Sequence, residues 1–148
     1  MQVNRAATMQ LESISANAPI REVATKMKAT NVGLLLVADK RRLLGVVTDR
    51  DIVIRAFAEG KCPGKTCARD IMSHPVVCID GGAELEEAAK LMIEKKVRRL
   101  VVTNDDRQPV GVLSLDDIAF STHGDDTAAG VLEEIAQAPQ SSALFRTV

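Results

Sequence analysis

The sequence predicts an α/β (α+β) fold in which two copies of a strand–helix–strand–strand–helix unit are followed by a short C-terminal helix. Three observations support this prediction. The octapeptide GVVTDRDI at 45–52 returns as GVLSLDDI at 111–118. The helical spacing of apolar residues at 20–30 returns at 85–95, and short apolar runs flank both segments. Two copies are too few for a solenoid, so we expect them to pack about a pseudo-twofold axis that buries both apolar faces.

Each copy yields the same order of elements. The first strand is expected at 11–14 and again at 76–79, where short apolar runs precede turn residues. The helices at 20–30 and 85–95 follow, and the middle strands are predicted at 34–37 and 100–103. A polar turn leads to a third strand at 43–47 and 110–113. Thr48 and Ser114 then stand where this strand ends and a second helix begins.

The repeat divides the chain into four parts. Residues 1–60 form the first repeat, 61–69 a linker marked by Pro63 and Gly64, and 70–121 the second repeat. Residues 122–148 form a C-terminal helix, expected at 126–137, and a tail. The first copy begins without a clear counterpart of Asp-Ile-Met at 70–72.

The composition narrows the classes of function. With three Phe, no Tyr, no Trp and a formal net charge of −1, the chain has few stacking residues and lacks the basic surface of a nucleic-acid binder. The opening residues resemble no secretory signal, and the densest apolar run, at 32–38, is too short to span a bilayer. We therefore expect a cytoplasmic protein that binds neither nucleic acid nor membrane, with its three cysteines reduced.

The repeated motif places a hydroxyl residue three positions before an acid: Thr48 before Asp51, and Ser114 before Asp117. One interpretation is a pair of capping boxes, in which the hydroxyl and the carboxylate satisfy backbone amides at the start of a helix. The other is a ligand site. The hydroxyl would bond a phosphate oxygen near the positive end of the helix, and the acid would accept from both hydroxyls of a ribose.

Two arginines favour a ligand at the second copy. Arg98 and Arg99 stand at the start of its middle strand, and successive residues of a strand point to opposite faces. One guanidinium would face a phosphate, which it can bind through two hydrogen bonds, and a solvated pair is the alternative. The first copy has Gly and Leu at these positions, so only Arg50 and Arg55 could supply a cation there.

The order and doubling of these motifs resemble a tandem pair of CBS domains, a Bateman module, from about residue 9 to residue 121. IMSHPVVCI at 71–79 and VRRLVV before GVLSLDDI carry the resemblance most clearly. It implies a regulatory module that binds AMP, ADP or ATP, or else NAD or S-adenosylmethionine, in clefts between two repeats. It also implies a flat homodimer that signals to an effector protein and requires no cofactor.

The resemblance assigns a role to each matching position. Asp117 would hold a ribose, Ser114 a phosphate, and Arg98 with Arg99 further phosphate oxygens. Asp51 and Thr48 would take the first two roles in the other cleft. The adenine would lie in an aliphatic slot near Val77 and Ile79, or near Ile14 in the first copy.

The sequence lacks the parts of an enzyme. It holds two histidines, at 74 and 123, and the pair Cys62 and Cys67 has no second Cys or His pair to complete a zinc site. We therefore predict a non-enzymatic protein without a metal. The alternative to a nucleotide sensor is a dimeric scaffold whose repeated motifs are capping boxes only. Such a scaffold would respond to thiol oxidation through Cys62 and Cys67, which lie beside lysines in the linker.

Overall fold

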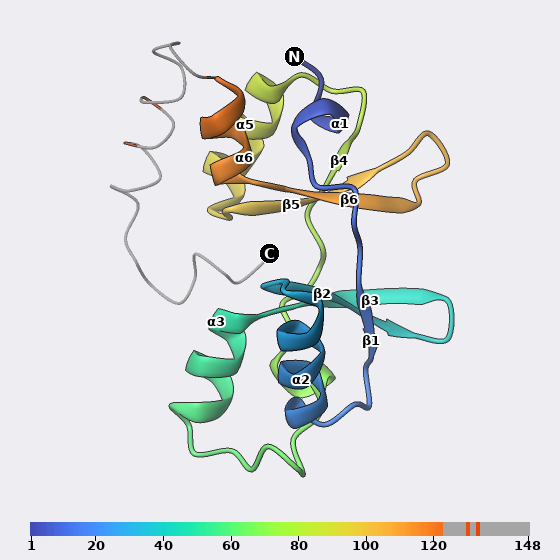
Figure 1. Ribbon diagram of the computed structural model, residues 1–148, viewed down its shortest axis with the longest axis vertical. Coiled ribbons are helices and arrows are strands. Elements are labelled where there is room, and N and C mark those ends of the chain that lie inside the picture. Colours follow the sequence, from blue (N-terminus) through green and yellow to red (C-terminus); the bar gives the residue numbers. More distant parts are fainter. Residues whose placement is uncertain (123–129, 131–132, 134–148) are drawn as a thin grey trace. The chain divides into compact units, whose positions relative to one another are not determined.

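The computed structural model describes residues 1–122, 130 and 133, so all but two residues of the helix expected at 126–137 lie outside the described part of the chain. The chain divides into two compact units (Figure 1). The first-repeat unit comprises Glu12–Val76. The second-repeat unit joins Met1–Leu11 to the residues from Val77 onward.

The first-repeat unit holds a three-stranded sheet in the order β1-β2-β3, with β1 parallel and β3 antiparallel to β2. Its elements are β1 (Ser13–Ser15), α2 (Ile20–Thr30), β2 (Leu34–Asp39), β3 (Arg42–Thr48), α3 (Asp49–Asp51), the π-helix η1 (Ile52–Phe57) and α4 (Ala68–Ile71). The helix that follows β3 therefore runs without a break from α3 into η1.

The second-repeat unit repeats this topology, with a sheet in the order β4-β5-β6. Its elements are α1 (Val3–Ala6), β4 (Cys78–Asp80), α5 (Leu85–Lys95), β5 (Arg99–Thr103), β6 (Pro109–Ser114) and α6 (Leu115–Ser121). The predicted fold class and the order of elements from β1 to η1 and from β4 to α6 are confirmed.

Each unit has its own apolar core, built from the residues whose spacing predicted the helices. Helix α2 buries Ile20, Val23 and Met27, and helix α5 buries four residues in the same pattern. The middle strands β2 and β5 contribute fully buried side chains that pack against these helices. Both helices end at a residue in the left-handed region, Asn31 and Lys96, which turns the chain into the middle strand.

A short helix precedes each repeat and packs on the other one. Helix α4 precedes the second repeat and packs on the first, and helix α1 precedes the first repeat and packs on the second. Residue Ser73, just after α4, pairs with Val46 of β3, with N···O distances of 3.0 and 2.7 Å. Residue Thr8, just after α1, pairs in the same way with Val112 of β6, at 3.0 and 2.9 Å. Each sheet thus gains one bridge from a segment that lies far away in the sequence.

This exchange pairs two short helices that differ in sequence. Helix α1 takes the place before the first repeat that α4 takes before the second, although the sequence has no clear match to Asp-Ile-Met there. The sequence signal for α1 is weak because this helix has no side-chain cap and buries only Val3. In α4, by contrast, the Asp70 carboxylate accepts from the Cys67 amide at 2.8 Å. Residues 70–76, expected to open the second repeat, pack in the first-repeat unit because of their bridge to β3.

Within the described residues, no helix combines the length and apolarity needed to cross a membrane, and no group of three or more His, Cys, Asp or Glu side chains could hold a metal. Cys62, Cys67 and Cys78 form no disulfide.

Candidate functional site

Both repeated motifs form the capping box that one interpretation predicted. In the first repeat, the Asp51 amide donates to Thr48 Oγ1 at 3.1 Å, and Asp51 Oδ2 accepts from the Thr48 amide at 2.9 Å. In the second, the Asp117 amide donates to Ser114 Oγ at 3.2 Å, and Asp117 Oδ2 accepts from the Ser114 amide at 2.7 Å.

The second-repeat acid keeps hydrogen-bonding capacity. Asp117 is half-buried, and among the described residues its carboxylate accepts only from Ser114, whose hydroxyl donates to Oδ2 at 2.7 Å. Oδ1 accepts no hydrogen bond from any described residue. One carboxylate oxygen at this position is therefore free to accept hydroxyl donors.

The first-repeat acid is in a different state. Asp51 is only 2% exposed, and the Ser73 hydroxyl lies 3.3 and 3.4 Å from its two carboxylate oxygens. Arg55 Nε lies 3.8 Å from Oδ1. Burial raises the pKa of Asp51, although the hydrogen bonds from Thr48 and the charge of Arg55 act in the opposite direction.

The two arginines of the second repeat lie next to its capping box. The Arg98 carbonyl accepts from the Leu115 amide at 2.9 Å, so Arg98 adjoins the first turn of α6. Its Nε atom is buried and has no hydrogen-bond partner among the described residues. Arg99 on β5 faces Ser114 on β6 as its register partner, and both are half-buried. The backbones of both sequence-predicted cations thus adjoin the Ser114–Asp117 motif.

The other predicted residues divide between surface and core. Arg50 is half-buried on α3, directly after the first-repeat cap. Val77 and Ile79 belong to the core of the second-repeat unit, and Ile14 to that of the first. Each of these three residues is less than 10% exposed, so an aliphatic slot at these positions would use the edges of core side chains.

Sequence reasoning missed Ser73 and gave Arg55 a different role. Arg55 Nη1 donates to the carbonyls of Ile71 and Met72, at 3.0 and 2.8 Å, instead of facing a phosphate. Its position four residues after Asp51 on one helix is a recognisable signal for an ion pair. Ser73 carries no local signal, because a bridge between distant segments brings it to Asp51.

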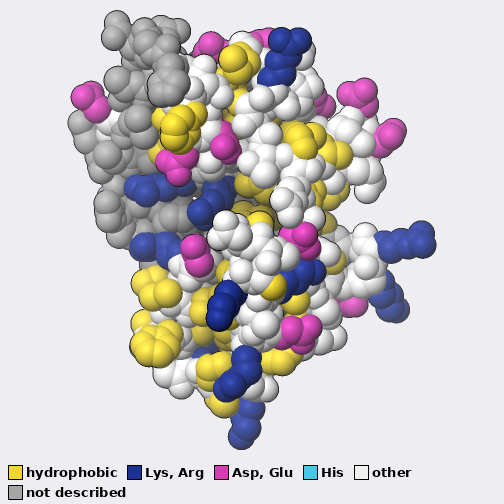
Figure 2. Space-filling model, in the orientation of Figure 1, with side chains coloured by type: hydrophobic (Ala, Val, Ile, Leu, Met, Phe, Trp, Pro, Cys, Tyr) yellow, Lys and Arg dark blue, Asp and Glu magenta, His cyan; other side chains and the backbone are white. Residues whose placement is uncertain are grey.

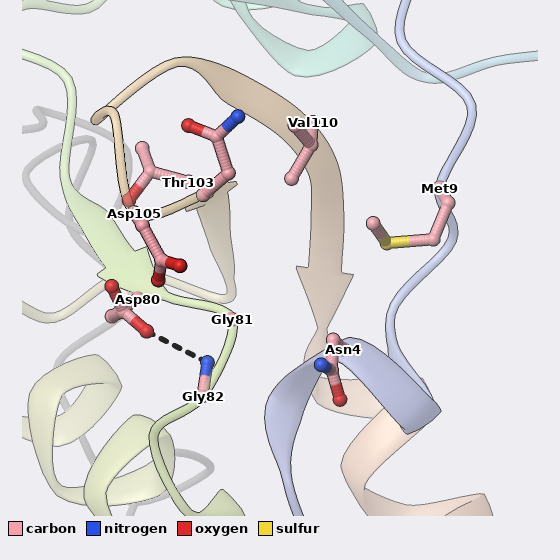
Figure 3. A pocket seen from close by; sticks show the side chains of 9 residues that line it. Asn4, Met9, Asp80, Gly81, Gly82, Thr103, Asp105 and Val110 are labelled. Carbon is pink, nitrogen blue, oxygen red and sulfur yellow. Dashed lines mark hydrogen bonds between the residues drawn. The ribbon is translucent and has the colours of Figure 1, made fainter.

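A pocket of about 300 Å³ lies at the other end of β6, in the second-repeat unit. Figure 3 shows Asp80 and Asp105 beside it, with Met9 and Val110 at its apolar side. Asp80 turns back to accept from the Gly82 amide at 2.7 Å. No sequence pattern predicts this pocket, because residues 105–106 have the composition of a solvated turn.

Charged side chains of both signs are interspersed on the face of the molecule shown in Figure 2. Apolar side chains also reach the surface, and among the described residues Val53 and Phe57 on η1 and Phe120 on α6 are more than half exposed.

Comparison with known proteins gives consistent matches. The family model for the CBS domain matches residues 5–57 and 68–124. Uncharacterized protein MK0525 of Methanopyrus kandleri is 39% identical over 98 residues, which are 66% of this chain and 50% of that protein, so the chain spans half of its length. CBS domain-containing protein YhcV of Bacillus subtilis is 35% identical over 129 residues, covering 87% of this chain and 91% of that protein. The structure of CBS domain protein PAE2072 from Pyrobaculum aerophilum complexed with AMP matches with a TM-score of 0.72 and 28% identity, covering 93% of this chain and 100% of that chain.

Proposed function

Because this chain belongs to the CBS-domain family, whose members are regulatory modules, we propose that it is a non-enzymatic sensor of an adenine nucleotide of the AMP, ADP or ATP class. The similar protein from Pyrobaculum aerophilum, complexed with AMP, supports this choice of ligand. NAD and S-adenosylmethionine share the adenosine moiety and belong in the same test.

The observation that carries the proposal is the free oxygen of Asp117 in a motif whose backbone adjoins Arg98 and Arg99. A carboxylate oxygen can accept from the hydroxyls of a ribose, as the acid of dinucleotide-binding folds does. Ser114, Arg98 and Arg99 supply the donors that phosphate oxygens require. The adenine would contact the apolar edges of Val77 and Ile79, which suits a chain that has no Tyr or Trp.

Isothermal titration of the full chain with AMP, ADP, ATP, NAD and S-adenosylmethionine tests the proposal. We expect saturable binding of at least one ligand, and its loss in Asp117→Ala. The matched control is Asp116→Ala, which removes an exposed carboxylate one residue away and should keep the affinity. Because loss of a cap lowers stability by about 0.5–2 kcal/mol, folding of each variant is checked by circular dichroism. Silence from all five ligands at millimolar concentration would overturn the proposal.

We further propose that the protein is a cytoplasmic homodimer which passes its occupancy to an effector protein. Val53 and Phe57, four residues apart on η1, present an apolar face of the kind that subunit contacts bury. Nucleotide binding would shift the state of the dimer only through different affinities for two conformations.

The alternative function, a thiol-responsive scaffold, is favoured by one observation. Cys62 is exposed, and the half-buried Cys67 stands at the N-cap of α4, whose following residues bridge to β3. Oxidation at Cys67 would disturb that bridge. A change in mass or stability on mild oxidation, absent in Cys67→Ser and accompanied by no nucleotide binding, would favour the scaffold.

A further inference from the structure

We infer that the chain holds one nucleotide site and not two, because Asp51 is a structural residue that fastens residues 68–73 to the first-repeat unit. The inference rests on the function proposed for the second repeat, and it concerns the corresponding acid of the first repeat. Asp51, Arg55 and Ser73 are called the Asp51 cluster below.

The carboxylate of Asp51 already has its partners within the protein. It accepts from the Thr48 amide at 2.9 Å, from the Ser73 hydroxyl at 3.3 and 3.4 Å, and it pairs with Arg55 at 3.8 Å. Asp51 and Thr48 are both buried, whereas Ser114 and Asp117 are both half-buried. A ribose hydroxyl that bonds Asp51 would compete with the Ser73 hydroxyl, so ligand binding at this acid would cost a hydrogen bond that the protein already makes.

The Asp51 cluster fixes the segment that contains α4. Arg55 donates through Nη1 to the carbonyls of Ile71 and Met72, where α4 ends. A cation at the carboxyl end of a helix is also stabilised by the negative end of the helix dipole. The neighbouring Ser73 bonds through its backbone to β3 and through its hydroxyl to Asp51. One buried acid thus orients both groups that hold this segment.

The second repeat lacks the corresponding partners. Thr8 takes the place of Ser73 in the bridge to β6, yet it is exposed and makes no hydrogen bond to Asp117 among the described residues. The residue four positions after Asp117 is Ser121, which has no charge to offer. Asp117 therefore keeps an open oxygen where Asp51 has none.

Titration calorimetry of the full chain with AMP tests the inference directly. We expect one AMP per chain, and an affinity for Asp51→Asn within about threefold of that of the unaltered protein. Asp117→Asn should weaken binding about 10- to 150-fold, the range that corresponds to a hydrogen bond to a charged group. Two AMP molecules per chain, or loss of binding in Asp51→Asn while the variant stays folded, would overturn the inference.

A second measurement separates this inference from the proposed function. Hydrogen exchange at the amides of Val46 and Ser73 should accelerate in Asp51→Asn and in the milder Ser73→Ala. The matched control Asp49→Asn, at an exposed position two residues away, should leave exchange unchanged. If none of AMP, ADP, ATP, NAD and S-adenosylmethionine binds but exchange accelerates as expected, the proposed function fails and the structural role of Asp51 stands. If exchange at both amides is unaffected by Asp51→Asn, that role is refuted whatever the titration shows.

Discussion

Gly45→Ala is expected to detach the segment after α4 from the first-repeat sheet. A Cβ atom at this position would lie 2.7 Å from the Ser73 carbonyl oxygen and 2.9 Å from Met72 Sδ. The sulfur could move aside, but the carbonyl is held by the Val46 amide and cannot retreat without breaking the bridge. Two backbone hydrogen bonds at about 0.5–1.5 kcal/mol each give a loss of about 1–3 kcal/mol. Strain from the added methyl group falls in the same range, so we expect the free energy of unfolding to fall by about 2–6 kcal/mol.

The assay is urea denaturation followed by circular dichroism, because the chain has no Trp or Tyr for fluorescence. The control is Gly64→Ala in the linker, where an added Cβ meets no atom within 4 Å and the free energy of unfolding should change by less than about 1 kcal/mol. Faster hydrogen exchange at the Ser73 amide should accompany the loss in Gly45→Ala. Equal stability of the two variants would show that the bridge does not hold the segment.

Three further changes probe other parts of the molecule. Gly111→Ala would place a Cβ 2.8 Å from the Thr8 carbonyl oxygen, so it should accelerate exchange at the Thr8 amide and leave the first-repeat unit unaffected. Burial raises the pKa of Asp51 in the folded state above its pKa in the unfolded state. The stabilisation that comes from this difference is therefore present below the unfolded-state pKa and is lost as the pH rises through the folded-state pKa. Asp51→Asn should therefore lower the free energy of unfolding more at pH 4 than at pH 7, and this loss should change by at most about 1.4 kcal/mol per pH unit. Urea denaturation at both pH values measures it, and an equal loss at pH 4 and pH 7 would contradict a raised pKa of Asp51. Phe57, which is 82% exposed, should tolerate Ser with a change in stability below about 0.5 kcal/mol, while sedimentation velocity should show fewer dimers; an unchanged dimer would remove η1 from the proposed contact.

The sequence was sufficient for the elements whose patterns are local. The spacing of Ile20, Val23 and Met27 predicted α2, and the doubled Thr/Ser-x-x-Asp motif predicted both capping boxes. It was insufficient where distant segments meet. Helix α1 escaped prediction because four residues with one buried side chain give no periodicity. The difference between Asp51 and Asp117 also escaped, because it depends on which residue the bridge to each sheet delivers.

The exchange of short segments between the repeats also sets an order of assembly during synthesis. The first-repeat unit is continuous in sequence, so it can fold as soon as Val76 has left the ribosome. The second-repeat unit must wait for β6 before Thr8 has a partner, and closing so long a loop slows its completion. Residues 1–11 are synthesised first and placed last. Until then Val3, which ends fully buried, and the edge of β6 are both open to other chains, so a truncation before β6 should favour aggregation over folding.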